Sequence, residues 1–313
     1  FEAFKHNVGR FMSEYGMQSF PDLKTIKTFA NEDDMNLQSD VIKVRQKASL
    51  GTGNLLKYIE QYYTIHNDFE SIVQLSQIMQ AEAIQTAVEA HRRNMPFCMG
   101  TLYWQFNDCW PAISWSSIDH QGNWKALHYT AKRFFSPVFL SIHESDNLID
   151  ICLINDQDHS INADLIIKLF SFDGSVLNEY SKNIEIPAIS SSIAFKLNRD
   201  TLIGSHDQSA VVLQCELKKD GTLITRNNFF FVKPKDLKLD EPVFEHQYKM
   251  VEGRHFIIIH SYSFTYKLHI HCLNSNGVFS DNYFEMLPNE TVEIEFEPTE
   301  YFNTDDHTFL FEL

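Results

Sequence analysis

The sequence of 313 residues predicts an α/β region followed by an all-β region, with the change close to Pro137. Before this proline, segments with helical spacing alternate with short apolar runs, which is typical of a parallel sheet covered by helices. After it, apolar and polar residues alternate with a period of two, and tight-turn dipeptides separate the runs. Hydrophobic residues make up 43% of the chain, so we expect a folded protein with sizeable cores.

The clearest helix is predicted at residues 69–93, where apolar side chains recur every three or four positions. Asn67 or Asp68 is expected to cap its first turn. The basic residues 91–93 suit the negative end of the helix dipole, and Pro96 prevents further helix.

Two other segments complete the α/β region. Residues 97–106, FCMGTLYWQF, form the short apolar run expected of a strand that is buried on both faces. Residues 122–135 return to helical spacing and predict a second helix. The segment GTGNLL at 51–56 lacks the glycine pattern of a phosphate-binding loop, and we expect a loop that precedes a helix.

The second part of the chain carries three strong hairpin signals, at Asp173-Gly174, Asp220-Gly221 and Asn276-Gly277. Its length suits two immunoglobulin-like β-sandwiches of about 80 to 100 residues each, with a join near residues 231–235. The expected domains are therefore residues 1–137, residues 138–234 and residues 235–313.

Two β-α units cannot close a parallel sheet or cover both of its faces, so residues 1–137 would expose hydrophobic surface on their own. We expect either that another chain covers this surface or that the sequence is the C-terminal part of a larger protein. The segment that opens the sequence, FEAFKHNVGRF, resembles the middle of a domain.

The net charge of −16 is concentrated in the all-β region, where 28 Asp and Glu face 13 Lys and Arg. A strongly negative surface repels phosphate backbones and anionic lipids, so nucleic acid and membrane surfaces are excluded as expected partners. The sequence contains no apolar run long enough to span a membrane and no signal peptide pattern.

Glu14 is the main catalytic candidate because it follows a strand-like run, NVGRFMSEYG, where α/β proteins build their active sites. A carboxylate there can be a nucleophile or a proton carrier, and paired carboxylates are typical of glycosidases. A structural ion pair is the alternative role. Trp104 ends the next predicted strand, and an indole ring there offers a flat face on which a sugar ring can pack.

The four tryptophans, Trp104, Trp110, Trp115 and Trp124, all fall within 21 residues. For Trp115 and Trp124 we favour a role as large core side chains.

Asp108 and Asp119 lie in the loop after the second strand and are expected to hold turns through backbone hydrogen bonds. His120 and His128 lack ligand spacing with other His, Cys or carboxylate residues, so no metal site is expected.

Three strings carry a resemblance to a known family: GRFMSEYGMQSFPD, MGTLYWQFNDCWPAISWSSIDHQGNWKALHYTAKRFFSPV and NNFFFVKPKDLKL. From Phe1 to about residue 240 the chain resembles the C-terminal portion of the β-mannosidases of glycoside hydrolase family 2. The middle string is the most specific, and the resemblance is vaguer beyond residue 240.

The resemblance implies that this chain supplies the last two β-α units of a (β/α)₈ TIM barrel, followed by two immunoglobulin-like β-sandwich domains. It further implies a retaining glycosidase without metal or cofactor, in which Glu14 is the nucleophile and Trp104 the aromatic floor of the sugar site. The general acid/base glutamate belongs upstream of Phe1, so the chain by itself is expected to be inactive.

The implied partners are a β-mannoside oligosaccharide or glycan, the missing N-terminal domains of the same polypeptide and, in addition, a homodimer partner. A periplasmic or secreted location is favoured by the resemblance alone. Two alternatives stay open: another family 2 exo-glycosidase of the β-galactosidase or β-glucuronidase type, and a non-catalytic carbohydrate-binding or structural β-sandwich module.

Overall fold

The computed structural model describes residues 1–66, 68–299 and 308–312. The chain folds into two compact units, each assembled from three stretches of sequence. The first unit comprises Phe1–Ser13, Gln85–Leu102 and Lys132–Asp240, and the second comprises Glu14–Ile84, Tyr103–Ala131 and Glu241–Leu313.

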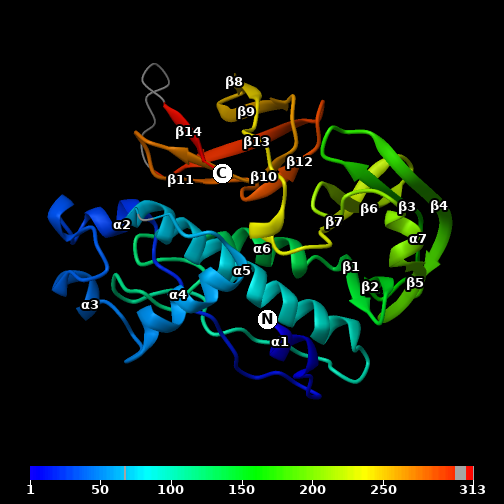
Figure 1. Ribbon diagram of the computed structural model, residues 1–313, viewed down its shortest axis with the longest axis horizontal. Coiled ribbons are helices and arrows are strands. Elements are labelled where there is room, and N and C mark those ends of the chain that lie inside the picture. Colours follow the sequence, from blue (N-terminus) through cyan, green and yellow to red (C-terminus); the bar gives the residue numbers. More distant parts are fainter. Residues whose placement is uncertain (67, 300–307, 313) are drawn as a thin grey trace. The chain divides into compact units, whose positions relative to one another are not determined.

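Helices occur mainly before residue 137, as predicted (Figure 1). They are α1 (Glu2–His6), α2 (Leu23–Lys27), α3 (Asp40–Val44), α4 (Gly51–Tyr62), α5 (Phe69–Arg93), α6 (Ala126–Phe134) and α7 (Arg199–Ile203), with short 3₁₀ turns η1 (Glu32–Asp34) and η2 (Pro234–Asp236). Among the described residues, no helix is both long and apolar enough to span a membrane.

Helix α5 has the bounds that the apolar periodicity predicts. The Asp68 carboxylate caps its first turn, because it accepts hydrogen bonds from the backbone N–H of Ser71 at 2.7 Å and from the Ser71 hydroxyl at 2.7 Å. The other predicted cap, Asn67, lies outside the described residues. Met79, Ala83 and Ile84 are fully buried on its apolar face.

One local prediction was wrong, and a predicted helix is shorter than expected. Residues 51–56 are not a loop but the first turns of α4. The helix predicted at 122–135 begins only at Ala126, because the backbone of Trp124 pairs with Ile118 in an antiparallel bridge.

The prediction of a strand buried on both faces at 97–106 was also wrong. Only Thr101 of this segment pairs as a β-bridge, in parallel with Met12. Cys98 is buried, but Met99 is 58% exposed and Leu102 55% exposed. Residues 97–106 are mostly apolar, but the described residues do not bury the whole segment.

The all-β prediction after Pro137 is confirmed. In the first unit, one sheet has the order β1-β2-β5, formed by β1 (Val138–Ser145), β2 (Leu148–Asn155) and β5 (Ser190–Asn198). A second sheet has the order β4-β3-β6-β7, formed by β3 (Ile161–Ser171), β4 (Val176–Ile186), β6 (Val211–Lys219) and β7 (Thr222–Phe229). All pairs are antiparallel.

A single apolar core fills the space between these two sheets. Leu140, Ile151 and Leu153 contribute from the three-stranded sheet, and Leu165 and Leu213 contribute from the four-stranded sheet. Every second residue of β3 is buried, so the period-two alternation of the sequence is what makes this strand one wall of a sandwich.

A second sandwich lies in the second unit. Its four-stranded sheet, in the order β11-β13-β9-β8, contains β8 (Phe244–Val251), β9 (Arg254–Ser261), β11 (Gly277–Phe279) and β13 (Thr291–Pro298). Its three-stranded sheet, β12-β10-β14, contains β10 (Thr265–Cys272), β12 (Phe284–Met286) and β14 (Phe309–Glu312). The Phe296 and Phe309 rings meet between the two sheets at 5.6 Å.

Of the three predicted hairpins, two are confirmed. Asp220-Gly221 joins β6 to β7 with both φ angles positive, and Asp173-Gly174 lies in the turn between β3 and β4. Asn276-Gly277 is not a hairpin, because β10 and β11 belong to different sheets.

Candidate functional site

The backbone at residues 10–15 runs parallel to the backbone at residues 99–104. In the first unit, the Met12 N–H donates to the Gly100 carbonyl at 2.8 Å, and the Leu102 N–H donates to the Met12 carbonyl at 2.8 Å. In the second unit, the Trp104 N–H donates to the Tyr15 carbonyl at 2.7 Å. Because both segments run in the same direction, their carboxyl ends lie side by side, and these ends carry Glu14 and Trp104.

Gly16 allows the two ends to approach so closely. A Cβ atom at this position would lie 2.4 Å from the carbonyl oxygen of Trp104 and 2.9 Å from Cδ1 of Trp115. No side chain fits there without movement of the backbone. The sequence alone does not indicate this role of Gly16, although Tyr15 and Gly16 directly follow Glu14.

Glu14 and Trp104 are both accessible. Glu14 is exposed, and Trp104 is 50% exposed, with a cis peptide bond to Gln105. A carboxylate in this setting can attack an electrophilic carbon or stabilise a developing positive charge, and an indole face can pack against the C–H groups of a sugar ring.

The other tryptophans have different surroundings. Trp110 is 38% exposed and faces the cations of Arg45 at 5.4 Å and Lys47 at 4.6 Å. Trp115 and Trp124 are half-buried, and the Trp124 ring packs against His128 with ring centroids 4.3 Å apart.

Asp119 holds turns in the way that the sequence predicts. One of its carboxylate oxygens accepts the backbone N–H groups of Gln121 and Asn123, each at 3.0 Å. The other accepts the hydroxyl of Thr25 at 2.6 Å and the backbone N–H of Asp22 at 3.2 Å. The carboxylate is buried and occupied by structural hydrogen bonds.

Asp108 is also buried, but its partners are side chains rather than a turn. It accepts hydrogen bonds from the hydroxyls of Ser114 at 2.8 Å and Ser116 at 2.6 Å. The prediction that the Asp108 carboxylate holds a turn through backbone hydrogen bonds was therefore wrong. These hydrogen bonds connect Asp108 to residues 114–116 of the same loop.

Lys125 is a buried cation that the sequence analysis missed. It is completely buried, and its Nζ has no hydrogen-bond partner among the described residues. Burial lowers the pKa of Lys125 to about 8, although the negative charges of Asp108 and Asp119 oppose this shift. In the sequence, Lys125 directly follows Trp124 near the start of a helix, where a lysine is usually exposed to solvent. No pattern in the sequence therefore predicted its burial.

Among the described residues, neither His120 nor His128 belongs to a cluster of possible metal ligands. His120 is exposed, while the His128 Nδ1 lies 3.0 Å from the Ser117 hydroxyl, and burial lowers the pKa of His128. Among the described residues, a cluster with ligand atoms close enough for a metal ion occurs elsewhere, at His269, His271 and Glu312.

Models of two domain families match the all-β region. A model described as a mannosidase Ig/CBM-like domain matches residues 147–236, and a mannosidase model described as an Ig-fold domain matches residues 239–308. The two sandwiches are therefore immunoglobulin-like domains of a kind that mannosidases contain.

Relatives extend the match into the α/β region. A β-mannosidase of Capra hircus is 32% identical over 242 residues, which cover 71% of this chain and 27% of the relative. β-Mannosidase A of Aspergillus oryzae is 26% identical over 335 residues, which cover 95% of this chain and 36% of the relative.

Solved structures agree. The crystal structure of a β-D-mannosidase from Dictyoglomus thermophilum matches 98% of this chain with a TM-score of 0.89 and 27% identity. An exo-chitosanase of Amycolatopsis orientalis matches 91% of this chain with a TM-score of 0.76 and 15% identity, which indicates a shared fold. The chain belongs to the β-mannosidases of glycoside hydrolase family 2 and corresponds to their C-terminal portion. It spans between 27% and 38% of the length of the three mannosidases named above.

Proposed function

We propose that the intact protein carrying this chain is a retaining β-mannosidase, which removes terminal non-reducing β-D-mannose residues from oligosaccharides or glycans. The observation that carries the proposal is the meeting of the two parallel segment ends, with the carboxylate of Glu14 on one and the indole of Trp104 on the other. The similarity to β-mannosidases along 95% and 98% of the chain supports this substrate over the β-galactosides and β-glucuronides of other family 2 enzymes.

Glu14 acts as the nucleophile in this proposal. One carboxylate oxygen attacks the anomeric carbon of mannose and forms a covalent ester, while the glycosidic C–O bond breaks and the leaving oxygen takes a proton from a second carboxylic acid. Water then attacks the same carbon and gives a proton to the second carboxylate, while the ester C–O bond breaks and releases mannose and the Glu14 carboxylate. The second carboxyl group is supplied by a part of the polypeptide outside these 313 residues, so the chain alone is inactive.

Trp104 binds the sugar rather than reacting with it, since an indole offers a flat apolar face and no usable proton. Its half-exposed ring is accessible to a ligand, and its backbone is held to Tyr15, the neighbour of Glu14, by the 2.7 Å hydrogen bond. A ring held in this way can keep the anomeric carbon in reach of the nucleophile.

Residues 1–137 form the last two β-α units of a TIM barrel in this proposal. The parallel pairing of Met12 with Thr101 and the position of α5 between the two segments in the sequence support this assignment. Exposed apolar side chains along the paired segments, among them Phe11, Met99 and Leu102, suit burial against the remaining barrel units, which are the missing N-terminal domains.

The domains at 138–234 and 235–313 are assigned a supporting role, either toward the barrel or in a homodimer. A carbohydrate-binding sandwich typically presents several exposed aromatic rings in one plane. Among the described residues after Pro137, Tyr262 is the strongly exposed aromatic side chain. One ring does not make a platform, so this observation disfavours glycan capture by the sandwiches.

The test of the proposed function is Glu14→Gln in the intact enzyme, assayed on an aryl β-mannoside with the matching β-galactoside and β-glucuronide as controls. We expect β-mannoside hydrolysis to fall by roughly 10⁴-fold or more, since glutamine keeps the shape but loses the nucleophile. External azide should restore turnover to Glu14→Ala. A loss below tenfold would assign Glu14 a structural role, and a preference for another glycoside would contradict the proposed substrate.

The second arm uses the 313-residue chain by itself. Its β-mannosidase activity should not exceed that of the same chain with Glu14→Gln. Hydrolysis that depends on Glu14 in this chain would show that the acid/base residue lies within it.

A further inference from the structure

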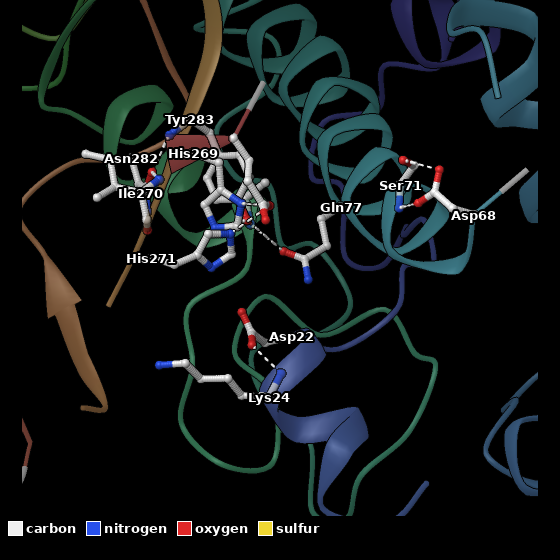
Figure 2. Close-up of polar contacts among 12 residues, drawn as sticks. Asp22, Lys24, Asp68, Ser71, Gln77, His269, Ile270, His271, Asn282 and Tyr283 are labelled. Atoms are coloured by element: carbon white, nitrogen blue, oxygen red, sulfur yellow. Dashed lines mark hydrogen bonds and ion pairs between the residues drawn. The ribbon is translucent and has the colours of Figure 1, made fainter. Parts of the chain in front are cut away.

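Two histidines on β10, His269 and His271 (Figure 2), meet a glutamate on β14 in the second unit. His269 and His271 are two residues apart on one strand, so their side chains leave the same face of the sheet. Glu312 pairs directly with His269 in the antiparallel register of β10 and β14. One ligand atom from each of the three side chains lies within 4.8 Å of the other two.

The hydrogen bonds around His269 determine which of its ring nitrogens carries the proton. The Ala126 backbone N–H donates to Oε1 of Gln77 at 3.3 Å, so this Gln77 atom is an acceptor. The Tyr283 hydroxyl donates to the same oxygen at 3.3 Å. Its own oxygen is then available to accept the Nε2–H of His269, 2.8 Å away.

In this arrangement the proton of the neutral His269 ring is on Nε2, so Nδ1 carries an unprotonated lone pair. The atom is buried and has no hydrogen-bond partner among the described residues, and it faces a carboxylate oxygen of Glu312 at 3.7 Å. A hydrogen bond from the other ring nitrogen is the usual means by which proteins orient a metal-binding histidine.

The surroundings favour a cation. The three side chains border a cavity of about 330 Å³ that is also lined by the acidic residues Asp22, Asp68 and Glu70, with no Lys or Arg among the described lining residues. The nearby Lys24 ammonium donates instead to the backbone carbonyls of Cys272 and Ser275, the latter at 2.9 Å. Figure 2 shows Asp22 on the opposite side of a gap from His271.

We propose that His269 Nδ1, His271 Nε2 and the Glu312 carboxylate bind one divalent transition-metal ion, with zinc as the preferred metal. Bonds of about 2.0 to 2.2 Å in tetrahedral geometry place ligand atoms roughly 3.4 Å apart. The 3.7 Å separation of His269 from Glu312 is close to this value, and the ion replaces the 2.8 Å hydrogen bond between His271 and Glu312. The fourth position opens to the cavity and takes a water molecule.

The ion ties β14 to β10 and has no part in glycoside hydrolysis. β14 has only four residues and is an edge strand of the three-stranded sheet, and its pairing with β10 is its one β-ladder among the described residues. A bond from Glu312 through the metal to two histidines of β10 holds this short strand in register.

The test is isothermal titration of the metal-stripped protein with zinc chloride, with the exposed Cys109 changed to serine in all variants so that its thiol does not bind the ion. We expect one zinc per chain, and Glu312→Gln and His271→Gln should each weaken binding by at least about 100-fold. Tyr283→Phe removes the acceptor that orients His269 and should weaken binding by about 10- to 100-fold.

His260→Gln is the matched control. His260 lies on β9 opposite Glu245, so it is also a cross-strand histidine and carboxylate pair, but no second histidine lies two positions away. Its zinc affinity should equal that of the parent protein. Zinc should also raise the melting temperature of the parent and the control, but not that of Glu312→Gln.

Cobalt(II) in place of zinc provides a direct reading of geometry, because a tetrahedral site gives visible absorption bands that an octahedral surface ion lacks. Absence of zinc binding in the parent, or equal binding by the parent and by the folded Glu312→Gln and Tyr283→Phe variants, would overturn the proposal. Circular dichroism establishes that each variant is folded.

Discussion

Alanine at Gly16 is expected to force apart the two segment ends that carry Glu14 and Trp104. The added Cβ would stand 2.4 Å from the Trp104 carbonyl oxygen and 2.9 Å from the Trp115 ring, where ordinary contacts are 3.4 Å or more. The closer neighbour is a backbone atom, which cannot rotate away as a flexible side chain can. The two segments must therefore separate by about 1 Å, which is the difference between an ordinary contact distance and the 2.4 Å distance from the added Cβ to the Trp104 carbonyl oxygen.

The displacement is expected to lower both the free energy of unfolding and the catalytic rate. Overpacking of this kind typically destabilises a protein by about 1 to 3 kcal/mol. A displacement of about 1 Å between a reacting group and its substrate can lower the rate by about 10²-fold, and Glu14 is two residues from the altered position. We therefore expect a loss in kcat that exceeds the loss explained by unfolding.

The assay is hydrolysis of an aryl β-mannoside by the intact enzyme, with kcat and KM determined at a temperature where urea denaturation shows both proteins to be folded. Gly53→Ala is the matched control, because Gly53 is inside α4 and a Cβ there meets nothing within 4 Å. It should leave kcat unchanged and stabilise the protein by about 0.5 to 1 kcal/mol. Full activity of a folded Gly16→Ala enzyme would refute the reasoning.

Other substitutions separate binding, folding and ionisation. Trp104→Ala should cost about 1 to 3 kcal/mol of transition-state stabilisation in kcat/KM, whereas Trp124→Ala should lower the melting temperature more than kcat, and an exchange of these two phenotypes would contradict the assignment. Burial lowers the pKa of Lys125 from 10.5 to about 8, so the unfolded chain binds more protons than the folded chain between these pH values. The free energy of unfolding of the wild type should therefore rise relative to that of Lys125→Met as the pH rises from 8 to 10.5, by up to about 3 kcal/mol. A constant difference in urea denaturation at pH 8 and pH 10 would show that Lys125 is not buried as a cation. Burial lowers the pKa of His143 from 6.5 to about 4, so the wild type should lose stability relative to His143→Asn as the pH falls through this range, which thermal denaturation at pH 7 and pH 4.5 can measure.

Local patterns predicted the long elements well. Helix α5 has the predicted bounds because 25 residues of apolar periodicity and a capping carboxylate specify a helix from nearby atoms alone. The Asp220-Gly221 turn is likewise local, since positive φ angles at both residues close a hairpin in which the two strands are adjacent in sequence. Such features need no information about distant partners.

Short apolar segments were predicted less well, since their state depends on what covers them. Residues 97–106 have the composition of a buried strand, yet Met99 and Leu102 are exposed in the described structure. Asn276-Gly277 has the composition of a hairpin, yet the following strand pairs with β13 in another sheet. Composition alone does not determine which strand becomes the neighbour.

The sequence by itself determined the change from a region with helices to an all-β region near Pro137, the helix at 69–93 and the family of the chain. It also predicts Glu14 and Trp104 as candidate site residues for glycoside chemistry. Periodicity and motif spacing are carried by neighbouring residues, so these conclusions follow from the order of amino acids alone.

Only the tertiary structure decided which distant groups come into contact. The approach of Gly16 to Trp104, the burial of Lys125 and the meeting of His269 with Glu312 each join residues far apart in the chain. Such contacts depend on strand pairing and on the packing of whole segments, whose energies arise from many weak interactions at once. The sequence does not indicate whether the side-chain nitrogen of a histidine or a lysine faces water or a carboxylate. These surroundings determine the protonation and the ligand binding of that nitrogen.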